Sequence, residues 1–227
     1  MKANKTPIEI ARNLYPLVFR TDFSQPGFAL LNLGADYGSE AQRQLMVELK
    51  RQFDQLEVQY RGRRLIYQSM GRFDQQVTTK PHRDGGPNES VLMLGYEPTL
   101  VQSRVAMSDY SKCAHALGIT PAEFLDRFNP MFVSGQNKLA DYTTETDDFD
   151  NTSFQILIIN NSTNPIGDGR LLGVLHTAEI VDPNPDLVRV VNSTMIASVS
   201  LSADDDISES EQADFVTTTV VRKAVYG

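Results

Sequence analysis

The spacing of apolar and polar residues divides the chain into a helical first quarter and a strand-rich remainder. Apolar residues recur every three or four positions in residues 7–18 and again in residues 39–56, which predicts two amphipathic helices. Between them, residues 27–34 form a short apolar run bounded by glycines, which predicts a strand. From residue 63 onward, eight short runs rich in β-forming residues are separated by Gly, Pro, Asn and Asp. Such a series is typical of a β-barrel or a β-sandwich.

Other segments interrupt the strand-rich part. Residues 120–123, Thr-Pro-Ala-Glu, have the spacing of a capping box with proline at the first helical position. They predict a helix over residues 121–128, after a shorter turn near 111–117. Residues 135–153 are polar and predict an exposed loop or a lid. Residues 202–212 are strongly acidic and predict a linker to one last strand.

These elements predict a single domain, since all-β units often reach a length of 227 residues. We expect residues 1–60 to form a helical N-terminal support and residues 61–201 to form the β core, with a helical insertion at 111–128. Residues 202–227 would form the acidic linker and the final strand. The predicted fold class is mainly β with flanking N-terminal helices, that is, α+β.

Composition is that of an ordinary globular protein, with 41% hydrophobic and 22% charged residues. The single cysteine, Cys113, has no partner for an internal disulfide. The first residues lack the uninterrupted apolar stretch of a signal peptide. No apolar run reaches the roughly 18 residues that a membrane-spanning helix needs. We therefore expect a cytoplasmic protein with no membrane partner.

Charge is distributed unevenly around the net value of −8. Residues 1–83 carry 13 basic and 8 acidic side chains, whereas residues 84–227 carry 8 basic and 21 acidic ones. An acidic chain without a long basic stripe makes nucleic acid an unlikely partner, because phosphate binding needs many lysines and arginines. The one basic cluster, Arg61, Arg63 and Arg64, is interpreted as a solvated strand edge.

The chain contains no G-x-S-x-G elbow, no Walker loop and no C-x-x-C pair, so the candidate chemistry depends on its three histidines. His115 falls in the predicted short helix and is interpreted as structural or exposed. His82 and Asp84 end a predicted strand before a Gly-Gly-Pro turn, and His176 lies inside another. Residues two apart in an extended chain point to the same side, so the His82 imidazole and the Asp84 carboxylate can converge.

Two imidazoles and one carboxylate on one face of an octahedron suit non-haem Fe(II) and leave three coordination positions open. A structural zinc site would instead be closed by four protein ligands. The H-x-D spacing is a weak signal by itself, because acidic residues are frequent in this chain. Its placement is more informative, since both metal-binding segments and a downstream arginine fall on separate predicted strands.

The order of His82 and Asp84, then His176, then Arg189 resembles that of the Fe(II)/2-oxoglutarate-dependent dioxygenases. The fold of this family is a double-stranded β-helix, or jelly roll, preceded by helices. Residues 78–86, TTKPHRDGG, carry most of the resemblance.

The resemblance covers roughly residues 60–200 and implies a role for each matching residue. His82, Asp84 and His176 would hold Fe(II), and Arg189 would bind the distal carboxylate of the co-substrate 2-oxoglutarate. The implied reaction hydroxylates a substrate and releases succinate and CO2. A guanidinium suits its implied role because it grips a carboxylate with two parallel hydrogen bonds.

This chain departs from the family pattern in two places. The interval between the two metal-binding segments is 92 residues, which is long, and the helical insertion accounts for it. Many members also carry a hydroxyl residue two positions after the arginine, where this chain has Val191. Ser193 is the nearest substitute on the same face of the strand after Arg189. Tyr67, on the strand before the metal motif, is a further candidate contact to the co-substrate.

Two alternatives stay open at this point. One is a cupin-like metalloprotein that uses the same three ligands without 2-oxoglutarate. The other is a non-catalytic β-domain that serves as a binding module, in which His82 and Asp84 cap a turn through local hydrogen bonds. The sequence leaves open whether a substrate would be a small molecule or a peptidyl side chain, and it leaves the oligomeric state open.

Overall fold

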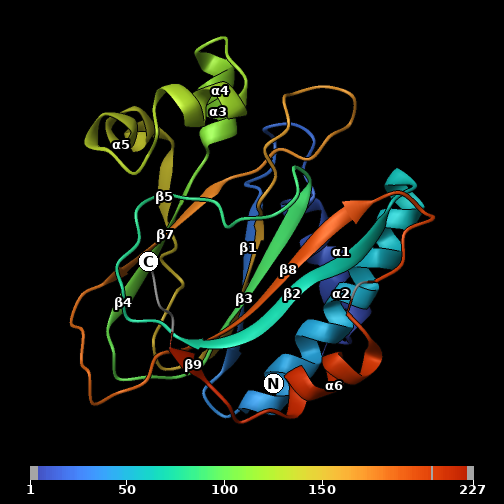
Figure 1. Ribbon diagram of the computed structural model, residues 1–227, viewed down its shortest axis with the longest axis vertical. Helices are drawn as coiled ribbons and strands as arrows, with labels where there is room; N and C mark the ends of the chain where they lie inside the picture. Colours follow the sequence, from blue (N-terminus) through green and yellow to red (C-terminus); the bar gives the residue numbers. More distant parts are fainter. Residues whose placement is uncertain (1–4, 206, 224–227) are drawn as a thin grey trace.

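The computed structural model describes residues 5–205 and 207–223, and it gives an α+β protein with two sheets (Figure 1). The six strands of the large sheet are, in spatial order, β1 (Phe28–Gly34), β6 (Phe154–Asn160), β3 (Ser90–Tyr96), β8 (Val190–Val199), β2 (Arg64–Asp74) and β9 (Arg222–Lys223). The three strands of the small sheet are β5 (Thr143–Glu145), β4 (Ser103–Ser108) and β7 (Leu175–Ile180). All neighbours are antiparallel except β2 and β9. Among the described residues, the ladders form two separate sheets and no closed barrel.

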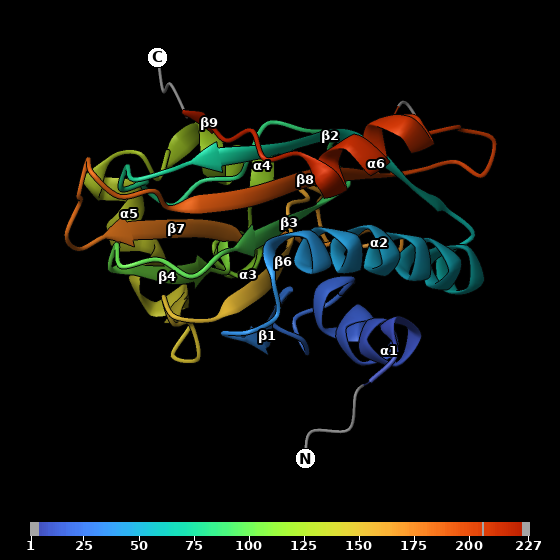
Figure 2. The same cartoon turned by 90° about the horizontal axis from the view of Figure 1, so that it is seen from below.

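The helices predicted from apolar spacing cover one face of the large sheet (Figure 2). Helix α1 (Pro7–Val18) begins at a capping box between Thr6 and Glu9. Helix α2 (Ser39–Arg61) is one turn longer than predicted and ends at Gly62, whose φ of 62° is the left-handed conformation that favours glycine. The predicted strand between these helices is β1. In the described part of the chain, no helix is both long enough and apolar enough to cross a membrane.

Alternating side chains give the large sheet a separate hydrophobic core on each face. On β3, Val91 and Met93 pack towards the helices, whereas Leu92 and Leu94 pack towards the small sheet. Because both faces are covered, every residue of β3 is buried. The molecule therefore has three layers, with the helices on one side of the large sheet and the small sheet on the other.

The predicted helical insertion follows β4 and forms a separate group at the top of Figure 1. It consists of α3 (Tyr110–Ala116), α4 (Pro121–Arg127), α5 (Val133–Leu139) and the 3-10 turn η1 (Ala140–Tyr142). The segment predicted as an exposed loop or a lid, residues 135–153, contains ordered elements in its first half: most of α5, then η1 and β5. Leu139 is buried together with Tyr110 and Phe124, and this apolar contact orders the segment.

The C-terminal region differs most from the prediction of an acidic linker and a final strand. Residues Glu209–Thr217 form helix α6, which a capping box between Ser208 and Glu211 starts. Phe215 and Val216 of this helix are buried in the core on the helical side. Burial of these side chains outweighs the strand preference of the Val- and Thr-rich run. The predicted final strand is reduced to β9, and its last residues, 224–226, lie outside the described residues.

Candidate metal centre

Backbone pairing brings the two histidines of the predicted triad together. The segment before β3 runs along the edge of β7, where the Thr79 amide donates to the Ala178 carbonyl at 2.9 Å. His82 and His176 form an antiparallel bridge, with N···O distances of 3.1 and 2.9 Å in the two directions. Their ring centroids are consequently 4.2 Å apart. Strand pairing thus places these two residues side by side although they are far apart in the sequence.

The carboxylate of Asp84 completes the group. Its Oδ1 lies 3.3 Å from Nε2 of His82 and 3.9 Å from Nε2 of His176. One candidate ligand atom from each of the three residues lies within 4.8 Å of the others. The predicted convergence of His82 and Asp84 is therefore confirmed, and the three residues form a group that could hold a metal ion.

The orientation of the imidazole rings suits metal binding. Nδ1 of His82 lies 2.8 Å from the carbonyl oxygen of Lys80, which can only accept a hydrogen bond. The Nδ1–H group therefore donates to Lys80, and Nε2 is the nitrogen that faces Asp84. Asp84 accepts the Nε2 proton while the ring is charged, and loss of that proton leaves a lone pair for a metal ion. His176 is only 6% exposed, and its buried Nδ1 has no hydrogen-bond partner among the described residues. Its other nitrogen, Nε2, faces Asp84 and is the one available to a metal ion.

The protonation states also suit a metal ion. Burial, reinforced by the neighbouring His82, lowers the pKa of His176 to about 4, so this imidazole is neutral at pH 7. Burial opposes ionisation of Asp84, but the hydrogen bond from protonated His82 and the positive charge of that ring leave the pKa of its carboxyl lowered. A carboxylate and a neutral imidazole are the forms that ligate metals.

The main chain of Asp84 is held by a side chain that the sequence analysis did not identify. Oδ1 of Asn161 accepts a hydrogen bond from the Asp84 amide at 3.0 Å, and its Nδ2 donates to the Asp84 carbonyl at 3.0 Å. Asn161 is completely buried, and its Nδ2 also lies 3.1 Å from the hydroxyl of Ser90. This pair of hydrogen bonds fixes the peptide that carries the carboxylate. An asparagine after a strand follows no pattern from which the contact could have been predicted.

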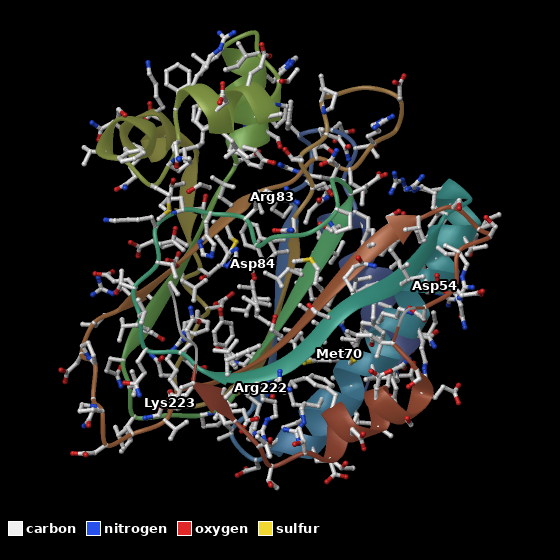
Figure 3. All side chains as sticks on the ribbon, viewed as in Figure 1. Asp54, Met70, Arg83, Asp84, Arg222 and Lys223 are labelled. Carbon is white, nitrogen blue, oxygen red and sulfur yellow. The ribbon has the colours of Figure 1, made fainter. Side chains whose placement is uncertain are left out.

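The three residues line a cavity of about 370 Å³ between the two sheets. Figure 3 labels Asp84 of this group. Its other lining residues are Phe73, Gln75, Leu94, Val191, Ser193, Arg222 and Lys223. The structure thus places Ser193, on the large sheet, in the lining of the same cavity as the candidate metal ligands. Val191 and Ser193 share this face of β8 because side chains two residues apart on a strand point to the same side.

Arg189 lies next to this cavity and is almost completely buried, with 1% of its surface exposed. Its Nε donates to the hydroxyl of Ser103 at 3.0 Å, and its Nη1 donates to the carbonyl oxygen of Gln75 at 3.2 Å. The guanidinium carbon lies 5.0 Å from the ring centroid of Tyr96. Gln75 lines the cavity, so Arg189 contacts a lining residue but does not itself line the cavity.

The structure does not bring Tyr67 to the cavity. The Tyr67 ring lies in the core on the helical side of the sheet, where Nζ of Lys50 is 4.7 Å from the ring centroid. A register shift between Tyr67 and Ser69 in the pairing of β2 with β8 causes this placement. Tyr67 and Phe73 are an even number of residues apart, yet the shift directs them to opposite faces.

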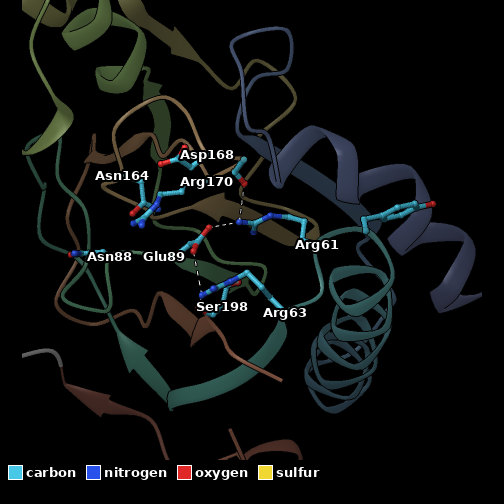
Figure 4. A pocket seen from close by; sticks show the side chains of 10 residues that line it. Arg61, Arg63, Asn88, Glu89, Asn164, Asp168, Arg170 and Ser198 are labelled. Atoms are coloured by element: carbon cyan, nitrogen blue, oxygen red, sulfur yellow. Dashed lines mark hydrogen bonds and ion pairs between the residues drawn. The ribbon is translucent and has the colours of Figure 1, made fainter. Parts of the chain in front are cut away.

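Two arginines of the cluster, Arg61 and Arg63, line a different pocket, of about 630 Å³ (Figure 4). The third, Arg64, lies outside this pocket, 3.4 Å from Asp54. Arg61 forms ion pairs with Glu57, at 2.6 Å, and with Glu89. Arg63 lies 3.3 Å from Glu89. Arg61 and Arg63 therefore take part in a network of ion pairs within the protein. The sequence had predicted a solvated strand edge.

Comparison with known proteins adds no assignment to this geometry. No protein-family model matches the chain, and no curated protein matches it in sequence. The functional evidence therefore consists of the residues themselves. These establish an α+β protein in which His82, Asp84 and His176 could together hold a metal ion.

Proposed function

We propose that the protein is an Fe(II)- and 2-oxoglutarate-dependent dioxygenase that hydroxylates a substrate and releases succinate and CO2. The observation that carries the proposal is the group of His82, Asp84 and His176 in the wall of a cavity between two sheets. Two imidazoles and one carboxylate are the donor set of non-haem iron oxygenases, and they leave positions open for co-substrate and oxygen. Bound Fe(II) would supply the oxygen chemistry, and the protein would bind and orient the reactants.

The order of the strands supports a jelly-roll core. Eight segments follow one another in the chain: β2, residues 78–82, β3, β4, β5, β6, β7 and β8. Residues 78–82 pair with β7 and are therefore counted with the small sheet. Successive segments then alternate between the two sheets, with the one exception that β4 and β5 lie in the same sheet. A jelly roll also folds eight strands into two facing sheets. The remaining strands, β1 and β9, extend the large sheet at its two edges.

The walls of the cavity support the binding of a co-substrate. Phe73, Leu94 and Val191 are apolar and would limit the access of water, whereas Ser193 offers a hydroxyl. Arg189 is proposed to bind the distal carboxylate of 2-oxoglutarate. Its hydrogen bond to Ser103 holds the guanidinium at this end of β8.

The test is an anaerobic titration of Fe(II)-loaded protein with 2-oxoglutarate, followed by the visible charge-transfer band of the chelated keto acid. The wild type is expected to develop the band. Arg189→Ala is expected to need at least about tenfold more co-substrate, because a hydrogen bond to a charged group contributes about 1.5–3 kcal/mol. Arg104→Ala is the matched control, since the side chain of Arg104 is 65% exposed on β4. Iron binding without any band would contradict the proposal.

A second candidate is a cupin-like metalloprotein that uses the same ligands without 2-oxoglutarate. The contacts of Arg189 favour it, because the guanidinium already donates hydrogen bonds to Ser103 and Gln75. Under this hypothesis Arg189→Ala would lower stability and leave metal affinity unchanged. The same titration separates the two candidates, since only a dioxygenase develops the band.

A further inference from the structure

Two cationic side chains of the C-terminal strand line the candidate metal cavity. Strand β9 pairs in parallel with the end of β2, with Arg222 opposite Phe73 and Lys223 opposite Asp74. Both cations belong to the lining of the cavity, together with His82, Asp84 and His176. Arg222, Lys223 and Asp84 are labelled in Figure 3. Because Arg222 is in register with Phe73, it lies on the face of the sheet that Phe73 presents to the cavity.

The side chains of both cations lack polar partners among the described residues. Within residues 5–205 and 207–223, neither Arg222 nor Lys223 makes a side-chain hydrogen bond or an ion pair. Both side chains are exposed. By contrast, the buried arginines Arg20, Arg43 and Arg72 each bind a carboxylate. Two adjacent cations without a carboxylate partner are therefore available to a ligand.

Their position is unusual for this chain. Residues 84–227 carry 8 basic and 21 acidic side chains, so positive charge is scarce in this part. Arg222 and Lys223 are nevertheless consecutive, and they are the only arginine and lysine among the described residues that line the cavity. A pair of like charges at the wall of a cavity raises the local concentration of ligands of the opposite sign.

We propose that Arg222 and Lys223 bind a carboxylate or phosphate group of the substrate, so that the substrate is a small anionic molecule. The substrate assignment rests on the proposed function, which gives the distal carboxylate of the co-substrate to Arg189. A cavity of about 370 Å³ has the size of a small-molecule site. Arginine and lysine bind carboxylate and phosphate through charge-assisted hydrogen bonds.

The experiment measures the binding of two anionic probes, benzoate and phenyl phosphate, and of the neutral probe benzamide. Saturation-transfer NMR would follow each probe with metal-free protein and with protein loaded with Zn(II) and 2-oxoglutarate. The test variant is Arg222→Ala/Lys223→Ala. The charge-matched control is Arg12→Ala/Arg51→Ala, which removes two exposed cations from α1 and α2, on the other side of the large sheet.

We expect the anionic probes to bind the wild type at least about tenfold more tightly than benzamide, as charge-assisted hydrogen bonds require. This preference should disappear in the test variant and persist in the control, while the affinity for 2-oxoglutarate stays unchanged in both. Equal binding of all three probes to the wild type would overturn the proposal, as would a preference that survives in the test variant. A loss of 2-oxoglutarate affinity in the test variant would also overturn it, because the cations would then serve the co-substrate.

The metal-free arm separates this inference from the proposed function. If the protein binds neither iron nor 2-oxoglutarate, the dioxygenase proposal fails. The preference of metal-free protein for the anionic probes, and its loss in Arg222→Ala/Lys223→Ala, would still support an anion-binding pair in the cavity. Absence of that preference in protein that does bind iron and 2-oxoglutarate would overturn the inference alone.

Discussion

The two faces of the large sheet bury polar groups in different ways. On the helical face, the carboxylate of Glu97 accepts hydrogen bonds from Arg72 at 2.8 Å, from Asn192 at 2.9 Å and from Ser39 at 2.6 Å. On the cavity face, by contrast, Oδ1 of Asp84 lies 3.3 Å from Nε2 of His82 and 3.9 Å from Nε2 of His176, and all three residues line a cavity.

This difference separates structural polar groups from functional ones. A fully hydrogen-bonded network in a buried place stabilises one arrangement of helices and strands. Polar groups that converge on a cavity can instead bind a ligand there. The helical face is therefore expected to respond to substitution through stability, and the cavity face through ligand affinity.

The largest effect is expected for Glu97→Ala on the helical face. The Glu97 side chain is 13% exposed, and its removal leaves the buried guanidinium of Arg72 without its carboxylate. We expect the free energy of unfolding to fall by about 3–5 kcal/mol. Urea denaturation would measure it, with metal affinity unchanged. Glu179→Ala is the control, because Glu179 and Arg104 form an exposed pair at 3.9 Å that contributes little. If both variants lowered the free energy of unfolding by the same amount, the Glu97 network would not be a structural one, and the distinction between the faces would be lost.

Local spacing was sufficient to predict the helices at 7–18 and 39–56 and the strand that carries His176. The strand predicted to end at His82 and Asp84 was not found, because His82 forms only an isolated bridge with His176. Tyr67 could not be placed in this way, because a single register shift in β2 reverses the faces of all residues before it. Asn161 could not be predicted either, since its contact with Asp84 joins segments that are distant in the sequence. Helix α6 could not be predicted because it depends on the burial of Phe215 in the core, which local sequence does not show.

A smaller effect is expected for Asn161→Ala on the cavity face. Loss of the two hydrogen bonds to the Asp84 peptide frees the carboxylate from its position. We expect affinity for Co(II), measured by its visible absorption, to weaken by about tenfold to a hundredfold. Asn192→Ala is the matched control, because it removes a buried amide from the other face and should lower stability alone. If metal affinity fell in proportion to the loss of stability in both variants, Asn161 would have no positioning role.

The pH dependence of metal affinity provides a finer test of the cavity face. Burial lowers the pKa of His82, but hydrogen bonds to Asp84 and to the Lys80 carbonyl outweigh it and leave the pKa above 6.5. His176, with a pKa of about 4, is already neutral in the range where His82 carries a proton. One proton must therefore leave when a metal binds, so affinity should fall about tenfold for each pH unit between pH 6 and pH 5. Titrations with Co(II) at these pH values would measure the slope. A hundredfold fall per unit would mean that His176 is protonated as well.

The smallest effect is expected for Tyr67→Phe, which tests whether the sheet separates its two faces completely. The Tyr67 hydroxyl is buried on the helical face and has no hydrogen-bond partner among the described residues. Its removal should therefore leave the free energy of unfolding unchanged or raise it by up to about 1 kcal/mol. The dependence of the charge-transfer band on 2-oxoglutarate should stay that of the wild type. A weaker response to 2-oxoglutarate would instead support the sequence-based assignment of Tyr67 to the co-substrate, and the two faces would then be coupled through β2.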